Sequence, residues 1–231
     1  MAGIVGLRAE DMEQVDALKR ARLDFFPQGL PMVRPQVRAL ALLREGDRTV
    51  ARPARFGFSR KFPSMNARME KLQESTLWKS MFGKSHGVVP ISYCIEWIGD
   101  GDERRPYLIQ PKGGGIWYAP ALVGHHFEHK DEIAFAICTR EPSRFFGYFH
   151  DRMVGVLTKE LVDRWLHPTD HAPKGLLECI RKPDDDELEA VPTTPDITKR
   201  KAGDWSNLPA TGPPLRWADV LPKLSQAAPK T

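Results

Sequence analysis

Residues 37–58, VRALALLREGDRTVARPARFGF, are the stretch of sequence that decides the fold. Two runs of β-favouring residues flank Glu45-Gly46-Asp47, a combination typical of a turn, so the stretch predicts a hairpin with strands at 37–43 and 49–58. Pro53 has no backbone N–H, which limits the second strand to a sheet edge or a bulge. A hairpin of this kind indicates a core built from antiparallel strands.

The chain on either side of the hairpin continues this β-rich pattern between short helices. Further strands are predicted at 88–97, 107–110, 116–123, 132–138, 153–157 and 189–192, and helices at 9–22, 72–82, 159–166 and 173–181. We therefore expect an α+β fold, a single domain with a curved, mostly antiparallel sheet or barrel-like core flanked by short helices. The domain is expected at 1–195, followed by a proline-rich extension at 196–231 that is partly extended or disordered.

The net charge of +4 over 231 residues is distributed unevenly. Residues 1–90 hold 16 Lys and Arg against 9 Asp and Glu, and the remainder is slightly acidic. The basic part is the better place to expect a polyanion partner, although a solvated basic surface explains the same counts. Cys94, Cys138 and Cys179 are far apart, which indicates neither a disulfide framework nor a cysteine zinc site. With no predicted membrane span or secretory signal, a cytoplasmic protein without membrane contacts is expected.

His150 is the first candidate for chemistry, because it follows five residues rich in aromatic side chains and begins the tetrad His150-Asp151-Arg152-Met153. An imidazole with an unperturbed pKa of ~6.5 suits proton transfer at neutral pH. Asp151 and Arg152 could orient the ring or bind phosphate. The alternative is a histidine that caps a strand and bonds to the backbone.

Two further polar islands precede His150 in the chain. Glu96 ends an apolar run, where desolvation would raise its pKa toward that of a general acid, although an outward-facing glutamate fits the same alternation. Asn66 and Arg68 share one face of an extended segment, with Ala67 turned away. Their alternative is a polar loop ahead of a helix.

Other residues are candidates for binding. Arg55 and Arg60 interleave with Phe56, a mixture suited to phosphate neutralisation and base stacking, or equally a solvated strand over buried phenylalanines. Three histidines at 125–129 lack further ligands that would close a metal site, so we expect no metal there. The triple glycine at 113–115 is interpreted as a turn, because the lysine of a phosphate loop is missing.

In chain order, these islands resemble the SOS-response-associated peptidase family, which shields abasic sites in single-stranded DNA. The matching pieces are Asn66-Ala67-Arg68-Met69-Glu70, Glu96-Trp97, Thr139 and the tetrad from His150 to Met153. The resemblance implies that Glu96 and His150 handle protons, while Asn66 holds the reactive N-terminus. It further implies DNA contacts, which we expect from Arg55, Phe56, Arg60, Arg68, Trp97, Thr139, Arg152 and Met153.

The chain departs from the family at the nucleophile. Family members carry a cysteine directly after the initiator methionine, whereas this chain has Ala2. If Met1 is removed, the α-amino group of Ala2, with an ordinary pKa of ~7.7–8.0, is the preferred nucleophile toward an aldehyde. We therefore expect an imine on the abasic sugar, with lyase-like nicking or binding alone, rather than the family's durable DNA–protein crosslink through amine and thiol.

The resemblance implies a monomer whose partner is single-stranded DNA containing abasic sites, without a cofactor, associated with the nucleoid if the source is bacterial. A non-catalytic single-stranded DNA-binding protein is the alternative, and it predicts salt-sensitive binding that is indifferent to the lesion. A third class, a peptidase that uses the terminal amine, leaves the basic first part of the chain without a task.

Overall fold

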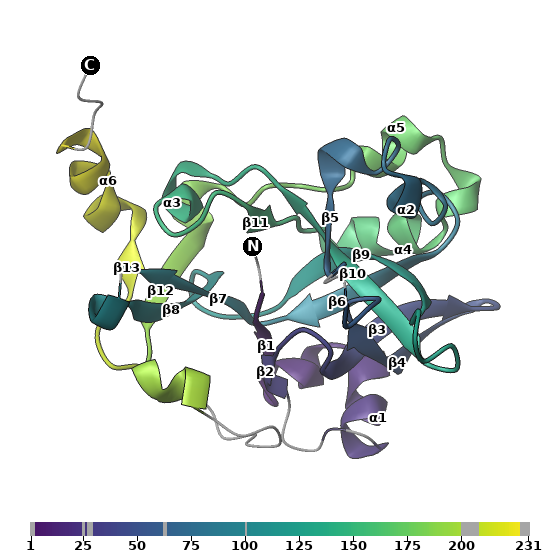
Figure 1. The fold of residues 1–231 in the computed structure, drawn as a ribbon, viewed down its shortest axis with the longest axis horizontal. Coiled ribbons are helices and arrows are strands. Elements are labelled where there is room, and N and C mark those ends of the chain that lie inside the picture. Colours follow the sequence, from purple (N-terminus) through teal and green to yellow (C-terminus); the bar gives the residue numbers. More distant parts are fainter. Residues whose placement is uncertain are drawn as a thin grey trace.

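The computed structural model describes residues 3–24, 26, 30–61, 64–99, 101–199 and 208–226. In this part of the chain the strands form a six-stranded and a seven-stranded sheet, which lie on opposite sides of the molecule in Figure 1. Pairing within both sheets is mostly antiparallel, and the helices are short. The expected α+β class with a barrel-like core is confirmed.

The predicted hairpin is present as β3 (Arg38–Glu45) and β4 (Arg48–Phe56). It is closed into a ring by β6 (His86–Ile91), β9 (Trp117–His125) and β10 (Ile133–Arg140), because β10 pairs with both β9 and β4. The β4–β10 pairing is parallel and involves only Arg55 and Phe56 of β4. Pro53 therefore stands where β4 has one partner strand, as expected for a residue without a backbone donor.

The other sheet has the order β13 (Leu215–Arg216), β12 (Leu188–Pro192), β8 (Arg105–Pro111), β7 (Tyr93–Ile98), β1 (Val5–Leu7), β2 (Leu30–Val33). The prediction of one strand at 88–97 is wrong, because the chain leaves the closed sheet after Ile91 and enters this one at Tyr93. Ser92 lies buried at the crossing, where its N–H donates to Gly6 O and its hydroxyl to Asp11. These bonds satisfy the polar groups of Ser92, which lies between β6 and β7 and takes part in neither strand pairing.

Two short strands extend β10 beyond the ring. β5 (Asn66–Arg68) pairs parallel with Ile137 to Thr139 of β10. It occupies the same edge of β10 that β4 occupies at Ala134 and Phe135. β11 (Met153–Val154) pairs with Thr139 and Arg140 on the opposite edge. Residues from three distant parts of the chain thus meet around the C-terminal end of β10.

Several helices are shorter than predicted. α1 (Asp16–Asp24) follows the 3-10 turn η1 (Asp11–Gln14), and α4 (Lys159–Leu166) has the predicted bounds. The helix predicted at 72–82 is only α2 (Thr76–Lys79), because Ser75 caps its first turn and Gly83 follows with a φ of 78°. The remaining helical pieces are η2 (Met69–Lys71), η3 (Gly101–Glu103), α3 (Arg144–Gly147), η4 (Pro168–Asp170), α5 (Pro173–Leu177), η5 (Asp185–Glu187), η6 (Pro195–Lys199) and α6 (Trp217–Gln226).

The described part of the C-terminal extension contains a strand and a helix. Its strand β13 adds to β12, and α6 packs on α3. The guanidinium of Arg144 lies 4.8 Å from the centre of the Trp217 ring, and the Lys223 ammonium 5.9 Å from that of Tyr148. Residues 200–207 and 227–231 lie outside the described chain. Across the described segments, no helix combines the length and apolar character needed to span a membrane.

Candidate active site

Glu96 is a buried carboxyl group with an unsatisfied oxygen. It lies in β7, its residue is 4% exposed, and its Oε1 has no hydrogen-bond partner in the described part of the chain. Burial raises the pKa of Glu96 to about 8, against the opposing charge of Arg104. Glu96 is therefore largely protonated at neutral pH and can donate a proton.

His150 lies in the turn between α3 and β11, with its Nδ1 facing two groups. The backbone N–H of Arg152 donates to Nδ1 at 2.9 Å, which requires an unprotonated nitrogen. The Oδ1 of Asp151 lies 2.8 Å from the same Nδ1, which requires a proton there. Burial lowers the pKa of His150, against the opposing charge of Asp151. A neutral imidazole able to accept a proton results at neutral pH.

Glu96 and His150 are brought to the same region by an aromatic contact. Tyr107 is the cross-strand partner of Glu96, and its ring lies 5.4 Å from the ring of Phe149, centre to centre. Phe149 precedes His150 in the chain. The charge of Asp151 also contributes to the raised pKa of Glu96, after burial. These contacts place the turn that carries His150 beside the β7–β8 ladder that carries Glu96.

Asn66 has an amide without partners in the described chain. It begins β5 beside Ile137, and both its Oδ1 and its Nδ2 are buried without a hydrogen bond to any described residue. Leaving a buried amide unpaired is costly, which makes it a candidate for binding a ligand or a further part of the chain. Arg68 projects two residues later, and its residue is exposed. The amide of Asn66 is thus buried, and the guanidinium of Arg68 is exposed.

Arg152 is committed to internal contacts. Its guanidinium forms a bidentate ion pair with Glu70, and its NH2 donates to Thr139 O at 2.7 Å. The pKa of Glu70 is lowered chiefly by this pair. The expectation that Arg152 meets a DNA phosphate is corrected accordingly, because its terminal nitrogens already join η2 and β10 to the His150 turn.

The start of the described chain runs beside β7. Val5 pairs with Cys94, and the N–H of Ile95 donates to Ile4 O at 3.0 Å, so the backbone leads toward Glu96 as it is followed back to Gly3. Gly6 permits this approach, because a Cβ there would lie 2.2 Å from the Tyr93 ring. Ala2, the expected nucleophile, lies outside the described residues. Cys94 is no substitute thiol, since burial raises its pKa well above the usual value.

Three expected DNA contacts are corrected by burial. Phe56 is fully buried and stacked on Phe135 in the core, with ring centres 5.1 Å apart. Thr139 and Met153 are buried as well, and the Met153 sulfur accepts the N–H of Ser143 at 3.2 Å. Apolar and small polar side chains on strands that face the core pack there, and no base can reach them.

The other expected contacts differ in how accessible they are. Arg55 is largely covered and paired with Glu132, whereas Arg60 is exposed. Trp97 is half-buried, with the Arg104 guanidinium 5.2 Å from the centre of its ring. Sequence reasoning missed Tyr107 and Phe149 as the link between Glu96 and His150, because their contact joins strand β8 to a turn more than 40 positions away along the chain.

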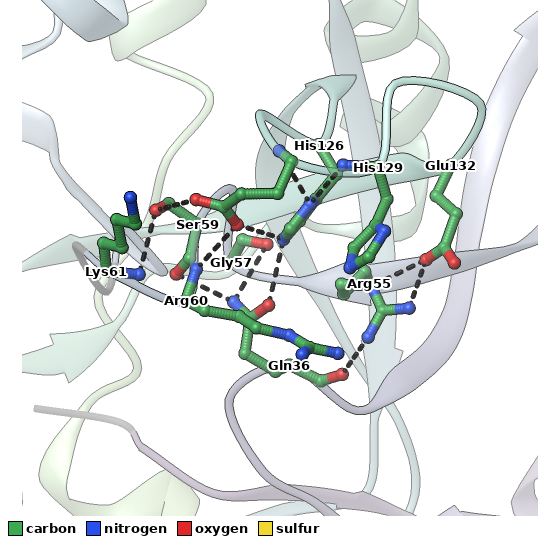
Figure 2. A network of polar contacts seen from close by, with 10 residues as sticks. Gln36, Arg55, Gly57, Ser59, Arg60, Lys61, His126, His129 and Glu132 are labelled. Carbon is green, nitrogen blue, oxygen red and sulfur yellow. Dashed lines mark hydrogen bonds and ion pairs between the residues drawn. The ribbon is translucent and has the colours of Figure 1, made fainter.

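The histidine cluster has a structural role at the opposite end of β10. His126 is fully buried, its Nε2 donates to Gln36 Oε1 at 2.9 Å, and its Nδ1 accepts the N–H groups of Glu128 and His129 (Figure 2). These contacts use both ring nitrogens. Within the described segments, no group of three or more His, Cys, Asp or Glu is placed to hold a metal ion.

Comparison with known proteins agrees with the motif pattern. Residues 12–200 match the family model described as SOS response associated peptidase (SRAP). The chain is 31% identical over 60% of its length to abasic site processing protein YMR114C of Saccharomyces cerevisiae, covering 39% of that protein. It is 26% identical over 70% of its length to abasic site processing protein YedK of Escherichia coli, covering 73% of it. For YobE of Bacillus subtilis, also named an abasic site processing protein, the identity is 26%, over 56% of this chain and 60% of YobE.

Solved structures share the fold. A protein from Bacteroides thetaiotaomicron superposes with a TM-score of 0.69 at 18% identity, covering 86% of this chain and 95% of that one. A phage-related protein of Bordetella bronchiseptica superposes with a TM-score of 0.64 at 19% identity, covering 90% of this chain and 99% of that one.

Proposed function

The chain belongs to the SOS response associated peptidase family, and on this premise we propose that it binds abasic sites in single-stranded DNA during the response to DNA damage. Three relatives are named abasic site processing proteins, which supports this substrate. The observation that carries the proposal is that the amide of Asn66 and the carboxyl group of Glu96, both in the family's motif positions, have buried atoms without a hydrogen-bond partner in the described chain.

These three residues fit the formation of an imine. With Met1 removed, the Ala2 amine adds to the aldehyde carbon of the opened sugar, and the proton that it loses passes to His150. Glu96, protonated because of its burial, donates its proton to the carbonyl oxygen, which becomes a hydroxyl group. The imidazolium of His150 then returns its proton to this hydroxyl group, which leaves as water while the nitrogen lone pair forms a protonated C=N bond. Asn66 is the positioning residue for the terminal amine, through its amide oxygen.

Strand cleavage is the second step that this arrangement supports. The imine draws electrons from the neighbouring carbon of the sugar, from which a base removes a proton while the 3′ phosphate leaves with the bonding electrons. His150 is the residue that we propose as this base. Without a thiol at position 2, the imine remains open to hydrolysis, so we expect a transient adduct and lyase activity.

Borohydride reduction tests the proposal directly. The full-length chain, with Met1 removal verified by intact mass, is incubated with an abasic single-stranded oligonucleotide and borohydride, and the adduct is separated by denaturing electrophoresis. We expect a trapped species with the abasic strand and none with the intact strand. Glu96→Gln and Asn66→Ala should slow trapping. No trapped species from the wild-type chain would refute the imine.

A non-catalytic single-stranded DNA-binding protein is the second candidate. It is favoured by Ala2 in place of the family's cysteine and by the exposed Arg60 and Arg68, which suit phosphates irrespective of the lesion. Equal affinity for intact and abasic strands at matched salt, with no adduct, would establish it. Under either candidate we propose a monomer that acts where the DNA is, in the cytoplasm or at the nucleoid of a bacterium.

A further inference from the structure

Phe127 is an exposed aromatic residue that the proposed chemistry does not use. It is 47% exposed, the highest value among the bulky hydrophobic residues of the described chain. It lies in the connection between β9 and β10, where its N–H donates to Phe58 O at 2.8 Å. Its ring centre is 5.7 Å from that of the buried Phe58. The ring is therefore anchored on the core while about half of the residue remains open to solvent.

Exposed positive charge lies beside this ring. Arg60 and Lys61 are exposed, and neither side chain has an ion pair with any residue that the structure describes. The N–H of Arg60 donates to Glu128 Oε2 at 3.0 Å, which places this loop against the segment that carries Phe127.

The neighbouring arginines of the hairpin differ in this respect. Arg52 pairs with Glu45, and Arg38 and Arg55 both pair with Glu132. The positive charge left available in this region is thus concentrated next to the exposed aromatic ring.

A polar network in which Ser59 and His126 are buried fixes the two loops in place, as Figure 2 shows. Gln36 Nε2 donates to Ser59 O at 3.0 Å, and its Oε1 accepts from His126 at 2.9 Å. The Glu128 carboxylate accepts from the Ser59 hydroxyl at 2.7 Å as well as from Arg60 N–H. Gln36 has a φ of 69°, a conformation that non-glycine residues adopt where surrounding contacts require it. A surface already fixed in this way binds a ligand with little loss of conformational entropy.

The chain beyond Arg60 and Lys61 returns to β10 at Met65, next to Asn66. Gly57 N–H donates to Phe135 O and Ile137 N–H to Met65 O, so the chain leaves β10 and returns to it two residues further on. Asn66 directly follows Met65. A strand bound with its reacting sugar near Asn66 can therefore continue over the loop that carries Arg60 and Lys61.

We propose that Phe127, Arg60 and Lys61 form a second contact site for single-stranded DNA, in which an unpaired base flanking the lesion stacks on Phe127 and the adjoining phosphates meet the two cations. An exposed aromatic ring beside exposed cations has the chemistry of single-strand recognition, since every base has a π face and every nucleotide a negative charge. This inference rests on the proposed function for the position of the reacting sugar.

Affinity measurements on matched variants test the site. Fluorescent intact and abasic oligonucleotides are titrated with the wild-type chain, Phe127→Ala, Phe127→Tyr and the double variant Arg60→Ala/Lys61→Ala over a range of salt concentrations. Phe127→Ala should bind both oligonucleotides roughly five- to fiftyfold more weakly, and Phe127→Tyr should retain wild-type affinity. The double variant should lower the slope of log affinity against log salt by about 1.4, for two phosphates. Leu221→Ala, at the other exposed bulky hydrophobic residue, is the matched control and should change nothing.

The outcomes separate this site from the proposed function. Wild-type affinity of Phe127→Ala, with thermal unfolding unchanged, would overturn the stacking site. Wild-type affinity of Phe127→Leu would do the same, because a protein-docking surface tolerates any large apolar side chain whereas base stacking requires a ring. If the wild-type chain gives no borohydride adduct, the imine fails, yet the comparison on intact strands still decides the role of Phe127.

Discussion

The ring of Phe149 packs edge-on against the ring of Tyr107, with 5.4 Å between their centres and 62° between their planes. Tyr107 stands opposite Glu96 in the β7–β8 ladder, and Phe149 directly precedes His150. One aromatic contact therefore connects the strand that holds the carboxyl group to the turn that holds the imidazole. This contact restricts how far the His150 turn can move relative to the β7–β8 ladder.

Replacing Tyr107 with leucine should therefore slow chemistry more than binding. Loss of the ring contact lets the His150 turn shift relative to β7, and a misplacement of ~1 Å can cost up to ~10²-fold in rate. We expect the rate of borohydride trapping at saturating abasic DNA to fall about tenfold, with little change in affinity for an intact strand. Tyr107→Phe retains the ring and is the control. Equal rates for the leucine variant and the wild-type chain would contradict the coupling.

The raised pKa of Glu96 predicts how stability changes with pH. The unfolded carboxyl titrates near 4.5 and the folded one at about 8, so the folded state holds the proton more tightly. This contribution is complete below pH 4.5 and is lost as the pH rises through 8, by on the order of 5 kcal/mol. Glu96→Gln cannot ionise and should lack this loss. Urea unfolding at several pH values measures both, and parallel pH profiles of the two proteins would contradict the assignment.

His86 predicts the opposite behaviour on the acid side. It is buried between Trp165 and Phe82, with Nδ1 bonded to Trp165 O and Nε2 accepting the N–H of Gly83, and burial lowers its pKa to about 4. Stability is complete above the unfolded pKa of 6.5 and falls as the pH drops through 4, by on the order of 3 kcal/mol.

His86→Gln should flatten this acid limb, because glutamine does not titrate. Unfolding free energies between pH 7 and pH 4 provide the measurement. His125→Gln, at an exposed histidine, should leave the limb as in the wild-type chain. An unchanged slope in the His86 variant would mean that another group is responsible.

Glu70 should matter through Arg152. Glu70→Gln leaves the buried guanidinium without its carboxylate, which should cost about 1–2 kcal/mol, discounted because Glu70 is itself partly open to solvent. The backbone N–H of Arg152 donates to His150 Nδ1, so a shift of Arg152 would change the surroundings of the imidazole. The pH profile of trapping should therefore shift as well. Glu74→Gln, which breaks the exposed pair with Lys71, should leave stability unchanged within measurement error. If Glu70→Gln and Glu74→Gln have equal effects on stability and on the pH profile of trapping, Arg152 does not position His150.

Much of the fold can be predicted from local patterns. The hairpin 37–58 is predictable because its turn lies between two β-favouring runs, and α4 because its apolar spacing is regular. The break at Ser92 is not, since an apolar run gives no sign that its two halves pair with different sheets. Tertiary hydrogen bonds to Gly6 and Asp11 decide that position, and they involve residues more than 80 positions away.

The candidate site divides in a similar way. Glu96, Asn66 and Asp151 can be named from residue type and order, because polar groups in apolar surroundings stand out in a sequence. Burial cannot be assigned to single side chains, which is why Phe56 is expected at the surface and lies in the core. Phe127, flanked by histidines and charges, gives no sequence signal that an exposed ring lies beside Arg60.

Ala2 sets the last prediction. With alanine at position 2, the amine alone can react with the sugar aldehyde, and the imine that forms hydrolyses readily. Ala2→Cys adds a thiolate able to attack the imine carbon, closing a five-membered ring through nitrogen and sulfur without loss of further atoms. We therefore expect the variant to give an adduct that survives denaturing electrophoresis without borohydride, whereas wild type requires the reductant. Ala2→Ser, with a weaker nucleophile of similar size, is the control. If Ala2→Cys forms no stable adduct although Met1 is removed, residue 2 does not reach the sugar, and the assignments of Asn66 and Glu96 to that chemistry fail with it.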